Sequence, residues 1–108
     1  SMSTEQLITD KLRQELAPEV LDVRNESHMH SGPATESHFR LCIVTGAFEG
    51  LSSVKRHQRV YAVLAQELAA GVHALALQTY TPDEWKRTEK IRESPQCMGG
   101  GRPQDSFR

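Results

Sequence analysis

The stretch Phe39-Arg40-Leu41-Cys42-Ile43-Val44-Thr45 is the part of the sequence that decides the fold. Nearly every side chain in it is apolar, and a short apolar run of this kind is typical of a strand in the middle of a sheet. We therefore predict a central strand over residues 39–45. Cys42 is expected to be an inert thiol in the core, because buried cysteine behaves as a small apolar residue.

Two further elements precede this run. Ser3 and Gln6 have the spacing of a capping box, and apolar side chains at helical spacing follow until Pro18 stops the helix. These apolar positions are Leu7, Ile8, Leu12 and Leu16. Residues 20–24 alternate between apolar and polar side chains, which predicts a first strand. A loop rich in Ser, His, Gly and Pro then leads to the central strand.

After the central run, the apolar stripe changes to a spacing of three and four residues. It consists of Val54, His57, Tyr61, Leu64 and Leu68. This spacing predicts one long helix that Gly71 ends. Residues 73–79 predict a third strand, in which Leu75 and Leu77 share a face with His73. We therefore expect His73 to point toward the helix-covered face, near its rim.

The quartet Thr81-Pro82-Asp83-Glu84 predicts the start of a last helix. It combines an N-cap threonine, a proline at the first helical position and a capping-box glutamate, with Trp85 next in line to be buried. The complete order is helix, strand, strand, helix, strand, helix. This order predicts an α+β fold with a three-stranded mixed sheet, made by a hairpin and a right-handed crossover, and with the helices on one face.

The chain of 108 residues is 37% hydrophobic and 25% charged, which suits one small core and is too short for two. Residues 1–2 are interpreted as an expression scar and the natural start, residues 3–91 as a single domain, and residues 92–108 as a disordered tail rich in Gly and Pro. No apolar run approaches the roughly 20 residues of a membrane span, and no secretory signal is evident.

Net charge and cysteine content narrow the classes of function. A net charge of −1 argues mildly against sequence-independent DNA binding, unless a local basic patch provides it. Cys42 and Cys97 form neither a disulfide framework nor a CxxC site, which indicates a reducing compartment. We therefore expect a cytoplasmic protein with no membrane partner, with an organellar matrix as the alternative.

Several short blocks, in order along the chain, resemble the BolA family, and in particular its bacterial BolA and BolA1-type branch. They are Asn25-Glu26-Ser27, Glu36-Ser37-His38-Phe39, Phe48-Glu49-Gly50, Arg56-His57, Val72-His73-Ala74-Leu75 and Thr79-Tyr80-Thr81-Pro82-Asp83-Glu84-Trp85. The resemblance implies a fold similar to the type II KH domain. It also implies a non-enzymatic partner of monothiol glutaredoxins that handles a 2Fe-2S cluster, for which glutaredoxin and its glutathione supply thiolates and the BolA-like protein supplies nitrogen ligands.

Within that resemblance, His73 matches the family's ligand histidine. His30 matches the loop histidine of the branch that has no cysteine in this loop, and His28 is a rival that the sequence does not exclude. The ordinary alternatives are a hydrogen-bonded rim residue for His73 and solvated loop residues for the other two. His57 and His38 are expected to be structural.

The alternative function is that of a DNA-binding transcriptional regulator. Lys55, Arg56 and Arg59 place positive charges near a helix start, where a phosphate would be favoured. The region that matches the KH-domain GxxG loop reads Gly50-Leu51-Ser52-Ser53 and lacks the second glycine. The same basic surface is expected to be able to serve both DNA and a glutaredoxin. No nucleophile elbow, paired-carboxylate motif or phosphate loop indicates an enzyme.

Overall fold

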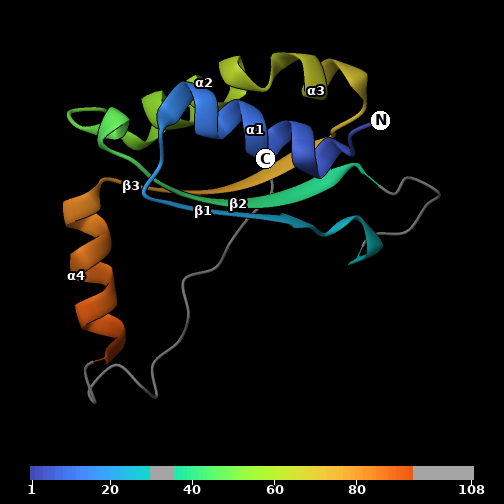
Figure 1. The fold of residues 1–108 in the computed structure, drawn as a ribbon. Coiled ribbons are helices and arrows are strands. Elements are labelled where there is room, and N and C mark those ends of the chain that lie inside the picture. Colours follow the sequence, from blue (N-terminus) through green and yellow to red (C-terminus); the bar gives the residue numbers. More distant parts are fainter. Residues whose placement is uncertain (30–35, 94–108) are drawn as a thin grey trace.

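The computed structural model describes residues 1–29 and 36–93 (Figure 1). Its elements, in chain order, are α1 (Thr4–Leu16), β1 (Val20–Asn25), the 3-10 turn η1 (Ser27–Met29), β2 (His38–Val44), the 3-10 turn η2 (Gly46–Phe48), α2 (Ser53–Val63), α3 (Ala65–Ala70), β3 (Ala74–Tyr80) and α4 (Pro82–Glu93). The predicted order of helices and strands is confirmed. No helix within these two ranges has the length and apolar character that crossing a membrane requires.

The three strands form one mixed sheet in the order β1-β2-β3, with the predicted central strand in the middle. β1 is antiparallel to β2, with Val20 opposite Val44 and Asn25 opposite Phe39. β2 is parallel to β3, and Val44 lies opposite Tyr80. One consequence matters for function: the C-terminal end of β1 and the N-terminal ends of β2 and β3 meet at the same end of the sheet.

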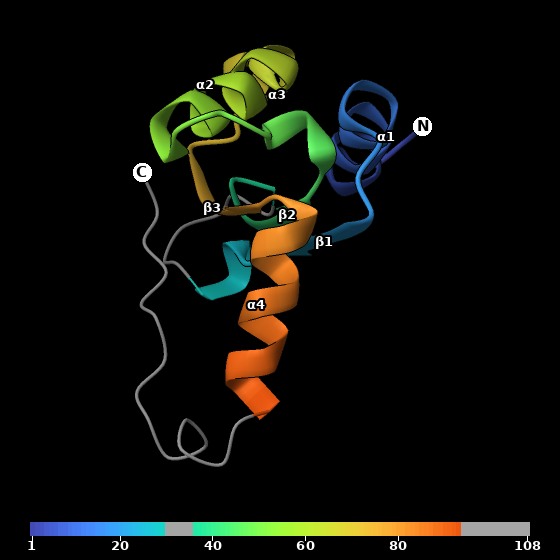
Figure 2. The ribbon, with the colours of Figure 1, turned by 90° about the vertical axis from the view of Figure 1, so that its left-hand side faces the viewer.

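The core lies between the sheet and the helices α1, α2 and α3, which cover one of its faces (Figures 1 and 2). Its largest fully buried side chains include Ile8, Leu12, Phe39, Leu41, Ile43, Phe48, Leu64 and Leu75. The helix α1 begins at the predicted capping box: Gln6 N–H donates to Ser3 Oγ at 3.2 Å, and Ser3 N–H donates to Gln6 Oε1 at 3.0 Å. Local caps and the apolar stripe thus act together to place α1.

The predicted long helix after the central strand is wrong in one respect, because it is interrupted at Leu64. This residue has φ −100° and ψ 19°, so α2 ends at Val63 and α3 begins at Ala65. The Leu64 N–H still bonds the Val60 carbonyl at 3.0 Å, and the Leu64 carbonyl accepts the Leu68 N–H at 3.0 Å. The interruption is therefore a local bend that keeps Leu64 fully buried.

The helix α4 begins as predicted but does not join the other helices. Glu84 N–H donates to Thr81 Oγ1 at 3.2 Å, and Thr81 N–H donates to Glu84 Oε1 at 2.9 Å, so the capping box is formed. Figure 2 shows α4 leaving the end of β3 on the side of the sheet away from α1 to α3. It buries no residue fully, and Trp85 packs beside Tyr80 with ring centroids 5.3 Å apart. The prediction of helices on one face therefore holds for three helices and not for α4.

Two smaller expectations also change. Cys42 is half-buried rather than in the core. Side chains alternate along a strand, so the core positions Leu41 and Ile43 place Cys42 between them on the opposite face of the sheet. The helix α4 continues to Glu93, two residues beyond the predicted boundary at residue 91. The rest of the predicted tail, with Cys97, lies outside the described residues.

Candidate functional site

The strand arrangement brings histidines from distant parts of the sequence to one end of the sheet. β1 runs directly into η1, which carries His28; β2 begins at His38; and His73 immediately precedes β3. The imidazoles of His28 and His73 are exposed, whereas His38 is half-buried. The next strand residues after His73 behave as predicted, since Leu75 is buried and Leu77 packs against the core. His73 thus stands at the rim of the sheet.

Hydrogen bonds tie these segments together. The Ser27 hydroxyl accepts the N–H groups of Ser37 at 2.9 Å and of His38 at 3.1 Å. The Ser37 carbonyl in turn accepts the N–H groups of His73 at 2.8 Å and of Ala74 at 3.2 Å. The turn that carries His28 and the segment that carries His73 therefore both rest on the backbone at the start of β2.

The predicted loop ligand His30 lies outside the described residues. Its rival His28 is placed by the structure, exposed on η1 at this end of the sheet. The choice between the two stays open, and both follow Ser27 by no more than three positions in the sequence. His28 therefore stands directly after the buried Ser27, and His30 follows two positions later in the sequence.

The donor set at this end suits a shared site. His73 and one loop histidine offer two nitrogens, whereas a 2Fe-2S cluster takes four protein ligands. Within residues 1–29 and 36–93, no three His, Cys, Asp or Glu side chains come together as a metal-binding group. The described residues at this end of the sheet therefore do not make up the four protein ligands of such a cluster.

An open pocket borders the His73 segment. Its walls come from the start of α1, from α3 and from the residues that lead into β2 and β3: Thr4, Leu7, Glu36, Ser37, Gln66, Glu67, Ala70, Gly71 and Val72. Its two carboxylates already have partners. Glu36 accepts the Thr4 N–H at 3.1 Å and the Thr4 hydroxyl at 2.9 Å, and Glu67 pairs with Lys11 at 2.7 Å. Lys11 therefore balances the charge of Glu67, whereas Glu36 is hydrogen-bonded by neutral groups and keeps its negative charge.

The predicted basic group on α2 separates into two kinds of residue. Lys55 and Arg59 are exposed, and they lie one helical turn apart. Arg56 is only 9% exposed. Its guanidinium pairs with both carboxylate oxygens of Glu84, at 2.6 and 3.0 Å, and its Nε donates to the Leu51 carbonyl at 2.9 Å. A role for Arg56 in binding DNA stays a prediction, but these contacts pair its charge with Glu84 inside the protein.

The Arg56–Glu84 ion pair connects the start of α2 to the start of α4. Arg56 also donates to the Thr79 carbonyl at 3.3 Å and lies over the Phe48 ring at 5.8 Å from its centroid. The hydrogen bond from Arg56 lowers the pKa of the Glu84 carboxyl from 4.5 to about 2, with a further contribution from the Thr81 N–H. The same pairing raises the pKa of Arg56.

Helical spacing contains a signal that separates these residues. Lys55 and Arg59 are four apart and share one face, whereas Arg56 is four residues before the buried Val60 and shares the face that meets the core. Treating the three cations as one patch misses this. Sequence reasoning also misses two other residues. Glu84 is the ion-pair partner of Arg56, and Ser27 holds the turn that leads to the loop.

Comparison with known proteins agrees with the fold. The family model for BolA-like proteins matches residues 12–84. BolA-like protein 1 of Bos taurus is 50% identical over 99 residues, covering 91% of this chain and 73% of its own length. The DNA-binding transcriptional regulator BolA of Haemophilus influenzae is 45% identical over 103 residues, covering 94% of this chain and all of its own.

Solved structures give the same result. The solution structure of BolA1 from Mus musculus has a TM-score of 0.73 and 46% identity, covering 92% of this chain and 81% of the other. The BolA domain of SufE1 from Arabidopsis thaliana also has a TM-score of 0.73, with 42% identity, covering 78% of this chain and 99% of the other. The family model and both kinds of relative thus agree, and the chain belongs to the BolA family.

Proposed function

We propose that the chain is a non-enzymatic adaptor that binds a 2Fe-2S cluster jointly with a monothiol glutaredoxin, for cluster trafficking or sensing. The observation that carries the proposal is the meeting of exposed His73 with the turn that leads to the loop histidines, at one end of the sheet. The resemblance to the BolA family suggests the partner. The glutaredoxin cysteine and its glutathione would supply the two thiolates that complete the set of ligands.

The chemistry of imidazole ligands suits cargo that has to be released. A cluster with two histidines on one iron has a higher potential than one with thiolates only, as in Rieske centres. Imidazole binds metal only when it is deprotonated, so a proton competes with the iron for the same nitrogen. Because His73 is exposed, a partner can reach its ring without rearrangement of the core.

The first prediction tests this class of function directly. Mixing the protein with a cluster-loaded monothiol glutaredoxin should give a one-to-one complex on size-exclusion chromatography, with a new visible circular dichroism spectrum. His73→Ala should lose the new spectrum while far-UV circular dichroism shows an intact fold, because the change removes an exposed ring outside the strand. His57→Ala, which removes the same ring from α2, is the matched control and should keep the spectrum. An unchanged spectrum in His73→Ala would contradict the assignment.

DNA binding is a second candidate function. It is favoured by the relative from Haemophilus influenzae, which is described as a DNA-binding transcriptional regulator, and by the two exposed cations Lys55 and Arg59 on α2. The overall charge of −1 does not add to it. We rank it second because two exposed cations supply few of the phosphate contacts that tight binding needs.

A further inference from the structure

Ser27 is a buried serine whose hydroxyl connects two segments far apart in the sequence. It is 3% exposed, and its Oγ accepts the N–H groups of Ser37 and His38 at 2.9 and 3.1 Å. The same oxygen lies 3.5 Å from the His38 carbonyl oxygen, to which it donates. The Ser27 N–H is itself held by Asn25 Oδ1 at 3.0 Å. Both the backbone N–H and the hydroxyl of Ser27, the first residue of the turn η1, are therefore hydrogen-bonded.

The connection continues to His73 through a single residue. The Ser37 N–H donates to the Ser27 hydroxyl, and the Ser37 carbonyl accepts the His73 N–H at 2.8 Å. A continuous path of two hydrogen bonds, the first of them buried, thus runs from Ser27 to the backbone of His73. The loop histidines His28 and His30 follow Ser27 closely in the sequence.

We propose that Ser27 is a positioning residue for the shared cluster site, and that its hydroxyl fixes the turn η1, which carries His28, relative to the backbone that holds His73. The inference rests on the proposed function. Two ligands from different segments bind one iron well only if their spacing is held, and groups outside the ligand shell commonly provide that restraint. Burial strengthens the restraint, because losing the hydroxyl would leave buried N–H groups without an acceptor.

A neighbouring serine provides the matched control. Ser37 is also 3% exposed, but its hydroxyl bonds Nδ1 of the adjacent His38 at 2.8 Å and is not part of the path to the loop. Ser37→Ala keeps the N–H and carbonyl groups that carry the path. Ser27→Ala and Ser37→Ala therefore remove the same atom at the same depth, and only the first removes the link.

The experiment compares these two variants in the complex with a cluster-loaded monothiol glutaredoxin. Ser27→Ala should shorten the lifetime of the mixed cluster by about tenfold or more, the effect typical of losing an outer-shell restraint, and should alter the visible circular dichroism. Ser37→Ala should keep the wild-type lifetime and spectrum. In the protein without cluster, hydrogen exchange at the Ser37 and His38 amides should accelerate in Ser27→Ala only, because these amides lose their acceptor.

The possible outcomes distinguish the inference about Ser27 from the proposed function. A wild-type lifetime in folded Ser27→Ala would overturn the inference and leave the proposed function intact. Failure of the wild-type protein to form a mixed cluster would overturn both. If Ser27→Ala does not fold, Ser27→Thr is compared with Ser27→Val, which has nearly the same shape without the hydroxyl. The lifetime should be longer in Ser27→Thr than in Ser27→Val, and equal lifetimes in the two folded variants would overturn the inference.

Discussion

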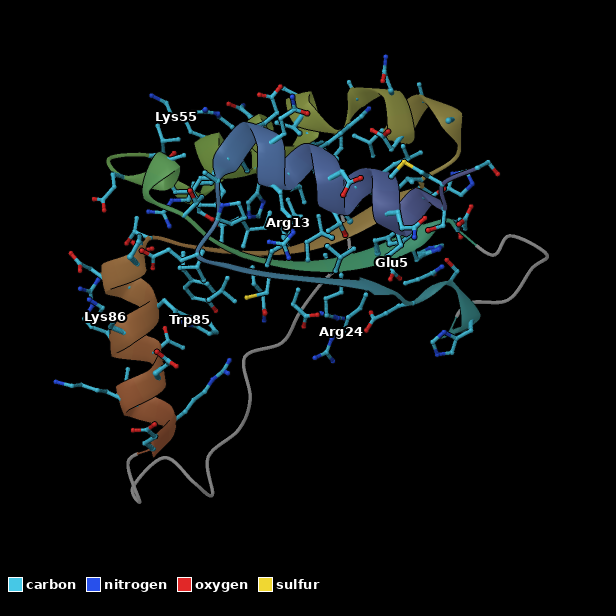
Figure 3. All side chains as sticks on the ribbon, in the orientation of Figure 1. Glu5, Arg13, Arg24, Lys55, Trp85 and Lys86 are labelled. Atoms are coloured by element: carbon cyan, nitrogen blue, oxygen red, sulfur yellow. The ribbon has the colours of Figure 1, made fainter. Side chains whose placement is uncertain are left out.

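Lys55 and Arg56 are adjacent in the sequence, yet their side chains have opposite surroundings. Lys55 is exposed, whereas Arg56 reaches across to Glu84 and is largely buried. Figure 3 shows Lys55 at the end of the molecule from which α4 leaves. A formal charge in the sequence therefore says little about its availability, because the face of the helix on which it lies determines whether solvent or a carboxylate meets it.

The second prediction, at the same scale, concerns the loop ligand. His30→Ala should shorten the lifetime of the mixed cluster by at least about tenfold, because losing a ligand should reduce metal affinity no less than losing an outer-shell group does. His28→Ala should leave it unchanged. Visible circular dichroism of the complex, followed over time, measures both variants, and each serves as the other's control because they remove the same ring two residues apart. The reverse result would assign the loop ligand to His28.

At the scale of whole elements, sequence patterns predict what local signals determine. Both capping boxes, at Ser3 and at Thr81, form as their residue types require. The bend at Leu64 has no such signal, since neither glycine nor proline stands there and the apolar stripe continues through it. The direction of α4 is also unpredictable locally, because it depends on contacts with residues distant in the sequence, among them Arg56.

The site also contains some features that local sequence patterns predict and others that they do not. Side-chain alternation correctly places Leu75 and Leu77 against the core beyond His73, because a strand repeats every two residues. Cys42 shows the limit of the same argument, since an apolar run does not reveal which face of the sheet stays uncovered. The Ser27 anchor is harder still to predict, because its partners lie 10 and 11 residues away across a loop.

The third prediction concerns the docking of α4 through Glu84. Its carboxyl pKa is lowered from 4.5 to about 2 in the folded protein, so the stabilisation is complete above pH 4.5 and disappears as the pH falls toward 2. The single Trp85 packs on Tyr80 on the side of α4 that faces the strands (Figure 3), so its fluorescence should report the change.

Glu84→Gln is the variant that tests this. It should lower the free energy of unfolding at neutral pH by about 1 kcal/mol, a modest value because the Glu84 side chain is 35% exposed to screening solvent. Its fluorescence should stay flat where the wild type changes between pH 4.5 and 2. Glu89→Gln, an exposed glutamate on the same helix, is the control and should titrate as the wild type does. An identical acid transition in Glu84→Gln and wild type would show that the ion pair does not hold α4.

At the scale of the whole molecule, the two candidate surfaces lie at opposite ends. His38 and His73 are at the N-terminal ends of β2 and β3. The helix α2 begins beyond the C-terminal end of β2, and Arg56 contacts Thr79 near the C-terminal end of β3. The expectation that one basic surface serves both DNA and the glutaredoxin is therefore not favoured for a complex centred on His73. The topology makes the two proposed functions separable by mutation.

The last prediction uses that separation. Reversing both exposed cations, Lys55→Glu with Arg59→Glu, should weaken DNA binding and reduce the salt slope by about 0.9 for each phosphate that the variant no longer neutralises, while the mixed cluster still forms. Lys86→Glu with Lys90→Glu, which changes the net charge equally on exposed residues of α4, is the control for long-range repulsion. At about 0.15 M salt, we expect the wild type to bind DNA no more tightly than roughly 10⁻⁴ to 10⁻⁶ M, the range of non-specific contacts. Nanomolar and sequence-selective binding that charge reversal abolishes and His73→Ala retains would instead make transcriptional control the primary activity, because the end of the molecule that carries the histidines would then be dispensable for it.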